Sequence, residues 1–245
     1  MECLIVEQAD LDLADGTLFL RGEEAHHAAK VLRLREGEEF LASDTLGTSY
    51  RAAVTGHEQM GKHEIQVGAR ILEVLPGYGE SELDVELVLG VLSQPSRWEF
   101  VIEKSVELGV TSIRPIVTER TEKRSPKLER SERILRAALK QSKRSTLPLL
   151  GELSTLSAAL SEAVKQGRHV YILHEAASED QGLLQQLQGN PPKSIALAVG
   201  PEGGFSDEEI DEAIRLGAKV ASLGSRRLRA ETAAIAALAI AQSVS

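Results

Sequence analysis

The sequence has little cysteine, few aromatic residues and no long apolar segment, and each shortage excludes a class of protein. Cys3 is the only cysteine among 245 residues, which excludes an intrachain disulfide and a cysteine-based zinc site. Aromatic residues make up 3% of the chain, which argues against a surface that stacks several RNA bases. The longest apolar run, Ala233–Ala241, is about half as long as a membrane span, and acidic residues interrupt the N-terminus where a signal peptide would lie. We therefore predict a soluble cytoplasmic protein with no membrane partner and no metal.

Negative charge dominates the chain, but positive charge is concentrated in one segment. The formal net charge is −9 at pH 7. Residues 114–148 contain eleven basic and four acidic residues, a local charge of +7 that leaves −16 for the rest of the chain. A basic segment in an acidic protein can attract phosphate, although it can equally be a solvated helix face. The composition permits an RNA partner without establishing one.

The first 75 residues are predicted to form a small β-barrel with one helix. Four short segments alternate in hydropathy or carry β-branched residues, and turn-forming residues separate them. These segments are Leu18–Leu20, Glu39–Ser43, Tyr50–Thr55 and Glu64–Val74. A helical segment, His26–Arg33, lies between the first two. The stretch Pro76–Glu80, rich in glycine and proline, predicts the end of this first domain, residues 1–75.

Strands and helices alternate over residues 81–245, which predicts a second, α/β domain built on a mostly parallel sheet. The predicted strands are Leu83–Leu92, Ser112–Val117, His169–His174, Ser194–Val199 and Lys219–Leu223. The predicted helices are Ser96–Leu108, Lys127–Ser145, Ser154–Gln166, Asp180–Gln188, Ser206–Leu216 and Glu231–Ser243. Ser206 and Glu209 predict a capping box at the start of the fifth of these helices.

A glycine-rich segment, residues 198–206 (AVGPEGGFS), joins a buried strand to this capped helix. Open α/β sheets bind ligands outside the carboxyl ends of their strands, and glycines allow the backbone to approach a ligand closely. The segment lacks Gly-Lys-Ser/Thr and does not match Gly-x-Gly-x-x-Gly, so phosphate binding is poorly supported. The alternative is a tight turn whose glycines serve only its shape.

A second loop, residues 223–232 (LGSRRLRAET), follows the next strand and carries three arginines. Arginines near a helix N-terminus are unfavourable, because that end of a helix is partially positive. We expect an anionic ligand there, or internal acidic partners such as Glu202 and Glu231; solvated surface arginines are the alternative. A third strand end, Leu173–Glu175, should lie at the same edge if the three strands are neighbours.

Together these segments resemble one family, the ribosomal small subunit methyltransferase E family (RsmE), within the SPOUT methyltransferases. The matching stretches are HHAAKVLRLREG (26–37), KSVELGV (104–110), TER (118–120), QSKR (141–144), GPEGGF (200–205) and LGSRRLRAET (223–232). They span nearly the whole chain in family order. Arg227 departs from the pattern, since an aliphatic residue is common in the family at that position.

The resemblance implies a PUA-like RNA-binding β-barrel for residues 1–75 and a SPOUT α/β methyltransferase domain with a trefoil knot for residues 81–245. It implies a homodimer that binds S-adenosylmethionine in the knot. It also implies methylation of N3 of a uridine in 16S rRNA, position 1498 in the customary rRNA numbering, with the 30S subunit as the partner.

The resemblance and the loop positions together suggest residue roles. Arg229 and Glu202 are the candidates for substrate orientation and charge stabilisation, and the N3 proton would go to solvent or to Glu202. The expected cofactor-binding residues are Leu173, His174, Gly200, Pro201, Gly203, Leu223, Gly224, Leu228 and Thr232. The expected RNA-binding residues are Arg33, Arg120, Arg136, Lys140 and Arg144.

Three alternative functions stay open at this point. A non-catalytic RNA-binding module would not bind S-adenosylmethionine. An enzyme of the same class could methylate a ribose 2′-hydroxyl or a tRNA base instead. A nucleotide-phosphate enzyme would need a lysine in the glycine-rich loop, and none is there.

Overall fold

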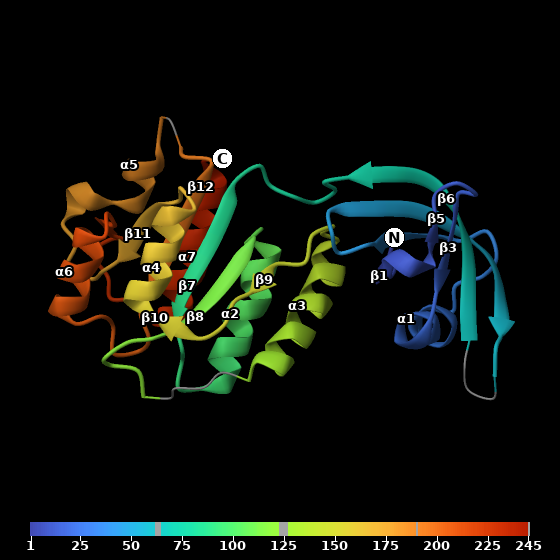
Figure 1. Cartoon of the computed structure of the whole chain (residues 1–245), viewed down its shortest axis with the longest axis horizontal. Coiled ribbons are helices and arrows are strands. Elements are labelled where there is room, and N and C mark those ends of the chain that lie inside the picture. The colour runs from blue at the N-terminus through green and yellow to red at the C-terminus, as the bar shows by residue number, and fades with distance from the viewer. Residues whose placement is uncertain (62–64, 123–126, 190, 245) are drawn as a thin grey trace. The chain divides into compact units, whose positions relative to one another are not determined.

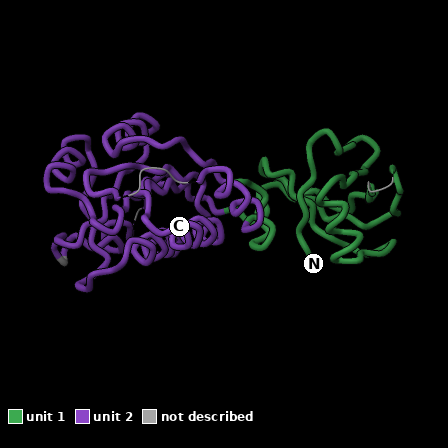
Figure 2. Tube along the Cα trace, turned by 90° about the horizontal axis from the view of Figure 1, so that it is seen from below, with its two compact units in different colours: residues 1–80, 139–147 green, residues 81–138, 148–245 purple. Residues whose placement is uncertain are grey.

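The computed structural model describes residues 1–61, 65–122, 127–189 and 191–244. Lys123 and Arg124 of the basic segment, and Glu64 of the fourth predicted strand, lie outside the described residues. The chain divides into two compact units, drawn in green and purple in Figure 2. The first unit comprises residues 1–80 and 139–147, and the second comprises residues 81–138 and 148–245. Residues 139–147 were predicted to belong to the second domain, whereas in the structure they group with the first unit.

The first unit is built on a six-stranded sheet in the order β1-β4-β5-β6-β3-β2 (Figure 1). Its strands are β1 (Cys3–Ile5), β2 (Leu11–Asp12), β3 (Thr17–Leu20), β4 (Glu39–Ser43), β5 (Thr48–Gln59) and β6 (Ile65–Pro76). Neighbouring strands are antiparallel except β1 and β4, which are parallel. Two irregularities in the pairing of β5 with β6, after Arg51 and after Val54, allow these long strands to curl. The sheet is curled and PUA-like.

One side of this sheet buries the apolar core of the first unit. The core residues include Leu4, Leu18, Leu20, Phe40, Tyr50, Val54 and Val67. Helix α1 (Gly22–His26) continues as a π-type turn (His27–Leu32) and packs Ala25 and Ala28 against this core. The π-type turn ends at Arg33, whose φ is 56°. The helical segment therefore begins four residues before the predicted His26.

Residues 139–147 contain the end of helix α3 (Leu128–Ser142). The carboxylate of Glu80 accepts hydrogen bonds from Nη2 of Arg144 (2.6 Å) and from the backbone N–H groups of Ser145 (2.9 Å) and Thr146 (2.8 Å). These N–H groups would otherwise bond to carbonyls one helical turn earlier. The helix was predicted to continue to Ser145; it ends at Ser142 because Lys143 adopts a left-handed conformation (φ 58°), and Glu80 then accepts from the N–H groups that follow.

The second unit is built on a seven-stranded sheet in the order β10-β8-β7-β12-β11-β13, with β9 beside β8 (Figure 1). Its strands are β7 (Asp84–Gly90), β8 (Ser112–Val117), β9 (Leu149–Leu150), β10 (Ser154–Thr155), β11 (His169–Leu173), β12 (Ser194–Val199) and β13 (Lys219–Ala221). Every described pairing in it is parallel. Strands β7 and β12 are buried along almost their whole length, as strands covered on both faces should be. The predicted parallel α/β fold is confirmed.

Two groups of helices cover opposite faces of this sheet (Figure 1). In one group, α2 (Pro95–Glu107) and α5 (Leu183–Leu187) pack against α7 (Ala230–Ser243). In the other, α4 (Leu156–Lys165) packs against α6 (Asp207–Arg215).

Local signals set the ends of several helices in the second unit. Ser206 and Glu209 form the predicted capping box at the start of α6. The helix predicted from Ser154 begins at Leu156, because Ser154 and Thr155 pair as β10 and the Thr155 side chain caps α4. The helix predicted over Asp180–Gln188 is a short 3-10 turn followed by α5.

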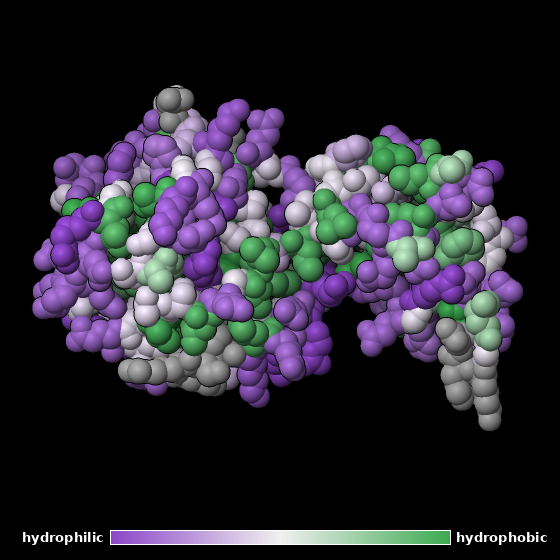
Figure 3. All heavy atoms as spheres, in the orientation of Figure 1, coloured by the Kyte–Doolittle hydropathy of each residue, from purple (hydrophilic) through white to green (hydrophobic). Residues whose placement is uncertain are grey.

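Among the described residues, no helix combines the length and apolar composition needed to cross a bilayer. Large apolar side chains do remain exposed on both units, such as Leu46 on the first and Leu149 on the second. Figure 3 shows apolar patches between the hydrophilic residues that cover much of the visible face. Apolar residues exposed in this scattered way are normal in folded proteins.

Candidate active site

A pocket of about 440 Å³ lies in the second unit, at the carboxyl ends of β11, β12 and β13. Three segments supply most of its lining, namely residues 173–175, 199–205 and 221–230. Arg97, Arg120 and Ala233 complete it. The three strands are neighbours and parallel, so their following loops meet at one edge of the sheet. The prediction that these three strand ends lie together is confirmed.

The glycines of the loop after β12 are required by its close packing. A Cβ on Gly203 would lie 2.8 Å from Cβ of Arg120, and a Cβ on Gly200 would lie 3.0 Å from the carbonyl carbon of Gly204. The loop also passes over Gly90 at the end of β7, where a Cβ would lie 2.4 Å from the backbone nitrogen of Pro201. Larger residues would therefore displace the loop from the pocket wall.

Arg120 holds the glycine loop in place. Its Nη1 donates hydrogen bonds to the carbonyl oxygens of Gly203 (3.2 Å) and Phe205 (3.0 Å). The residue follows β8 and was predicted to bind RNA. In the structure its Nη1 supports the loop, although the residue as a whole remains exposed.

The carboxylate of Glu202 is oriented by the segment that follows β7. Its Oε1 accepts hydrogen bonds from the backbone N–H (3.0 Å) and from Oγ (2.9 Å) of Ser93. The second oxygen, Oε2, lies 3.3 Å from the same backbone nitrogen. The side chain that the sequence singled out as catalytic is thus held as an acceptor at the pocket wall.

The arginine-rich loop after β13 keeps most of its charge exposed. Gly224 has a φ of 107°, which favours glycine, and its N–H donates to Oγ of Ser222 (3.1 Å). Arg227 forms an ion pair with Glu175 (3.1 Å) in which both side chains are mostly exposed. Arg229 is the N-cap residue of α7 and is exposed as well.

The acidic partners of these arginines differ from those expected. Glu202 binds Ser93, and Glu231 lies 3.5 Å from Nε of Arg97 rather than beside an arginine of its own loop. The expectation that Glu202 and Glu231 neutralise the arginine loop is therefore wrong. The chain order could not reveal these partners, because Ser93 and Arg97 come from the segment after β7, which reaches the pocket through the pairing of β7 with β12 and the packing of α2 against α7.

Ser93 and Arg97 are residues that the sequence analysis missed. One signal was present, since Arg97 is the third residue of α2, where a positive charge opposes the helix dipole. Its ion pair with Glu231 offsets that cost and directs the guanidinium to the pocket.

Ten of the eleven residues predicted to bind cofactor or substrate line the pocket. They are Leu173, His174, Gly200, Pro201, Glu202, Gly203, Leu223, Gly224, Leu228 and Arg229. Thr232 does not line it and is exposed. Ala230 and Ala233 face the pocket from α7. Successive residues of a helix are about 100° apart around its axis, so Thr232 points in a different direction. Its role in cofactor binding stays a prediction.

The other residues predicted to bind RNA differ in their exposure and in their partners. Arg33 on the first unit and Arg136 on α3 are exposed. Lys140 forms an ion pair with Glu24 (2.7 Å). Arg144 is 2% exposed and is held by Glu80, so its predicted contact with RNA phosphate is wrong. Two cations of the basic segment are thus paired with partly buried glutamates of the first unit.

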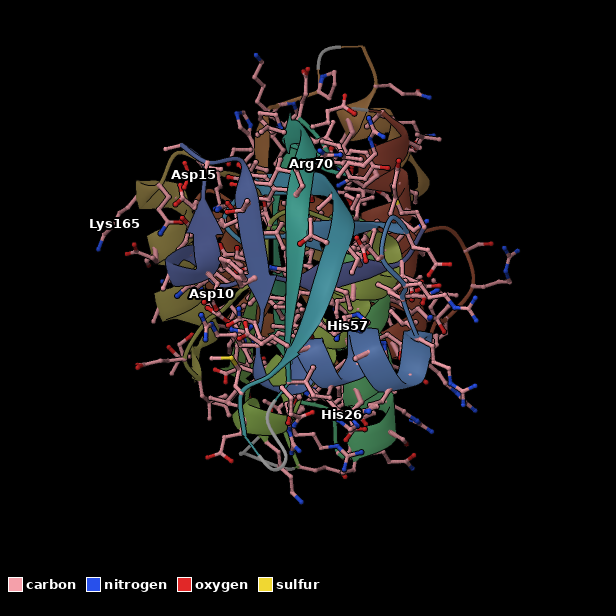
Figure 4. The ribbon with its side chains drawn as sticks, turned by 90° about the vertical axis from the view of Figure 1, so that its right-hand side faces the viewer. Asp10, Asp15, His26, His57, Arg70 and Lys165 are labelled. Atoms are coloured by element: carbon pink, nitrogen blue, oxygen red, sulfur yellow. The ribbon has the colours of Figure 1, made fainter. Side chains whose placement is uncertain are left out.

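No group of three or more histidine, cysteine or carboxylate side chains suited to a metal ion occurs within the described residues. In the first unit, His26 belongs to α1 and His57 to β5 (Figure 4).

Comparisons with known proteins agree with this geometry. A family model described as an RNA methyltransferase domain matches residues 79–242, and one described as an RNA methyltransferase PUA domain matches residues 20–67.

Named relatives are similar along almost the whole chain. The ribosomal RNA small subunit methyltransferase E of Synechocystis is 35% identical over 231 residues, which cover 93% of this chain and 73% of the relative. The structure of the protein of that name from Neisseria gonorrhoeae, bound to S-adenosylmethionine, has 31% identity, a TM-score of 0.84, and coverage of 99% of this chain and 97% of that chain. A Legionella pneumophila methyltransferase, solved with the same bound cofactor, has 32% identity, a TM-score of 0.79 and the same coverage.

The two domain matches and the similarity over nearly the full length agree with the residues that meet at the pocket. The chain belongs to the ribosomal RNA small subunit methyltransferase E family.

Proposed function

We propose that this chain transfers a methyl group from S-adenosylmethionine to N3 of a uridine in 16S rRNA, position 1498 in the customary numbering. The observation that carries the proposal is the convergence of two loops, residues 200–205 and 223–229, on one pocket. These loops contain the two motifs that together are most specific for the family. The relatives solved with S-adenosylmethionine support the choice of cofactor.

The residues of the pocket fit this cofactor. Leu173, Leu223 and Leu228 offer apolar walls to an adenine ring. A Cβ built on Gly224 would meet no protein atom, so the backbone there is open to a ligand. Glu175 and Glu202 supply negative charge, which suits a cofactor with a cationic sulfur.

The protein must orient the uracil and remove the proton from N3. When bound, S-adenosylmethionine supplies a methyl group on an electron-poor sulfur, so the transfer needs no covalent nucleophile. Loss of the N3 proton leaves negative charge shared by O2 and O4 of the base, which a guanidinium stabilises. Glu202, oriented by Ser93, is the candidate acceptor of that proton, and Arg229 is a candidate donor to the base.

The charge of the pocket supports an RNA substrate. Five arginines and two glutamates line it, although the whole chain carries a net charge of −9. A concave positive surface on an acidic protein concentrates a polyanion at one place. Arg33 and Arg136 are exposed and have no described ion pair, so both can add phosphate contacts outside the pocket.

Further roles follow from the family resemblance. We assign RNA binding to the PUA-like domain, residues 1–75, and methyl transfer to residues 81–245. A trefoil knot in the second domain, a homodimer, the 30S subunit as partner and a cytoplasmic location belong to the same proposal.

Methyl transfer from labelled S-adenosylmethionine to 30S subunits tests the proposal. The subunits are isolated from cells that lack their own enzyme, and subunits from wild-type cells, which already carry the methyl group, serve as the control. Primer extension then locates the product, because a methyl group on N3 blocks the pairing edge of the base. We expect label and one new stop near the 3′ end of 16S rRNA in the unmodified subunits only.

The other outcomes would each overturn part of the proposal. Label without a stop would indicate a ribose or another atom as the acceptor. Label in tRNA but not in 30S subunits would identify tRNA as the substrate. No label and no binding of S-adenosylmethionine in calorimetry would indicate a non-catalytic RNA-binding module.

A further inference from the structure

The pocket has two sides, which come from opposite sides of β12 in the sheet. Strands β11 and β13 follow β12 in one direction, and their loops supply Leu173, Leu223 and Leu228. Strand β7 lies on the other side of β12, and the segment after it supplies Arg97. The β11 and β13 side therefore supplies the apolar walls together with Arg226, Arg227 and Arg229, whereas Arg97 reaches the pocket from the opposite side of the glycine loop.

Arg97 is held on the β7 side of the pocket by a partly buried ion pair. Its Nε lies 3.5 Å from Oε1 of Glu231, and the two side chains are 28% and 13% exposed. Glu231 is the second residue of α7, where the helix dipole favours a carboxylate. Glu231 thus has a fixed position from which it can orient the guanidinium.

The terminal nitrogens of Arg97 make no hydrogen bond to any residue that the structure describes. The other arginines of the pocket differ from it. Nη1 of Arg120 donates to two carbonyls of the glycine loop, and Arg227 is 76% exposed in its pair with Glu175. Arg97 combines partial shielding from solvent, a carboxylate partner and terminal donors that bind no described residue.

These properties suit an arginine that donates hydrogen bonds to a substrate group that gains negative charge during the reaction. A guanidinium presents a planar fork of N–H donors to a carbonyl oxygen, and such donors contribute most when they are already in place and shielded from water. The charge of Arg97 is partly balanced by Glu231, so it suits charge that forms in the transition state better than a permanently ionised ligand.

We propose that Arg97, oriented by Glu231, donates from its terminal nitrogens to a carbonyl oxygen of the target base and stabilises the anion formed when N3 loses its proton. This inference rests on the proposed function, which supplies the base. Arg97 is then a catalytic residue that contacts substrate, and Glu231 is a positioning residue that acts through Arg97.

Arg97→Ala in the full-length chain tests the proposal, with Arg215→Ala as the control. Arg215 is an exposed helical arginine on α6 outside the pocket. We expect Arg97→Ala to slow single-turnover methyl transfer to 30S subunits about 100-fold, the usual cost of removing one such donor. Binding of S-adenosylmethionine, measured by calorimetry, should stay close to that of the wild type, whereas the melting temperature should fall because Glu231 loses its partner. The rates are therefore compared at a temperature at which both variants are folded.

Two further readouts separate this role from a structural one. Added guanidinium ion should restore part of the rate of Arg97→Ala but not change Arg215→Ala. The rate deficit of Arg97→Ala should also shrink as pH rises, because the base then loses its N3 proton with less help, whereas the pH profile of Arg215→Ala should follow that of the wild type. Glu231, and Glu202 and His174 in the same pocket, are unchanged in both variants. Glu231→Gln should slow transfer about tenfold alone and add no further loss to Arg97→Ala.

Several outcomes would overturn the inference. A wild-type rate in Arg97→Ala would exclude the catalytic role. Weakened binding of S-adenosylmethionine with an unchanged rate at saturation would assign Arg97 to the cofactor carboxylate. Additive losses in the double variant would remove Glu231 from the role of positioning Arg97. Wild-type protein that transfers no methyl group would overturn the proposed function and this inference with it, whereas the other outcomes leave the proposed function intact.

Discussion

The amino and carboxyl edges of the parallel sheet carry the same kinds of charged residue in opposite states. At the amino edge, Asp84 at the start of β7 accepts hydrogen bonds from Thr111 and Ser194 and pairs with Arg168 (2.7 Å). Two residues further along the strand, Glu86 is 2% exposed and pairs with Arg114 (2.8 Å). Four charged side chains thus share one network around the first residues of β7.

At the carboxyl edge, the charged side chains have fewer partners and more access to solvent. Arg97 has one ion pair and unused donors, and Arg229 is exposed at the start of α7. Glycines replace side chains where the loops cross, as at Gly203. Residue type alone therefore does not distinguish a structural charge from a functional one. The number of partners that the fold provides does.

If the amino edge is structural, removing its most buried charge should affect stability and little else. Glu86→Ala leaves Arg114 without its partner. It also removes one of the two carboxylates that pair with Arg168, whose side chain is 12% exposed. We expect the free energy of unfolding of the second unit to fall by about 3 kcal/mol. Trp98, the only tryptophan, is buried in this unit, so its fluorescence during urea unfolding measures the loss.

Glu82→Ala is the matched control, because Glu82 is an exposed glutamate just before the same strand. It should change stability by no more than about 0.5 kcal/mol. The folded Glu86→Ala protein should keep the wild-type rate of methyl transfer. A lower rate with unchanged stability would place the network in the reaction and end the distinction between the two edges.

At the carboxyl edge we expect the opposite result, a loss of activity with little loss of stability. Arg229→Ala should slow methyl transfer at least tenfold, equivalent to about 1.4 kcal/mol in the activation free energy, because an arginine that orients or stabilises the base is lost. Stability and binding of S-adenosylmethionine should stay nearly unchanged, since the residue is exposed. Single-turnover transfer and calorimetry measure the two effects. A wild-type rate would exclude Arg229 from the catalytic set.

The sequence predicted the carboxyl edge well because its signals are local. The segments 198–206 and 223–232 each follow an apolar strand and precede a helix, and parallel strands bring such loops to one edge. The same reasoning placed Leu173 and His174 beside them. The predicted pocket therefore needed only the order of the elements and the direction of the strands.

The residues that the sequence analysis missed depend on contacts between distant segments. Ser93 and Arg97 reach the pocket because β7 pairs with β12, more than 100 residues later in the chain. Arg144 lies in a basic segment that looks solvated, yet Glu80, 64 residues earlier, holds it in the interior. Charge runs indicate where cations are, whereas the tertiary partners decide which of them remain available to a ligand.

The smallest effect that we expect concerns the titration of Asp84. Burial would raise the pKa of this carboxyl, but hydrogen bonds from Thr111, Ser194 and Arg168 outweigh it and lower the pKa below the ordinary aspartate value of 3.8. A group with a lowered folded pKa stabilises the protein above its unfolded pKa, and this contribution is lost as pH falls through the folded pKa. Asp84→Asn should therefore be less stable than the wild type at neutral pH, by about 1 kcal/mol or less because the side chain is 43% exposed. The difference should fade as pH falls below 3.8, as measured by urea unfolding of both proteins. An equal difference at all pH values would mean that Asp84 contributes through its shape rather than its charge.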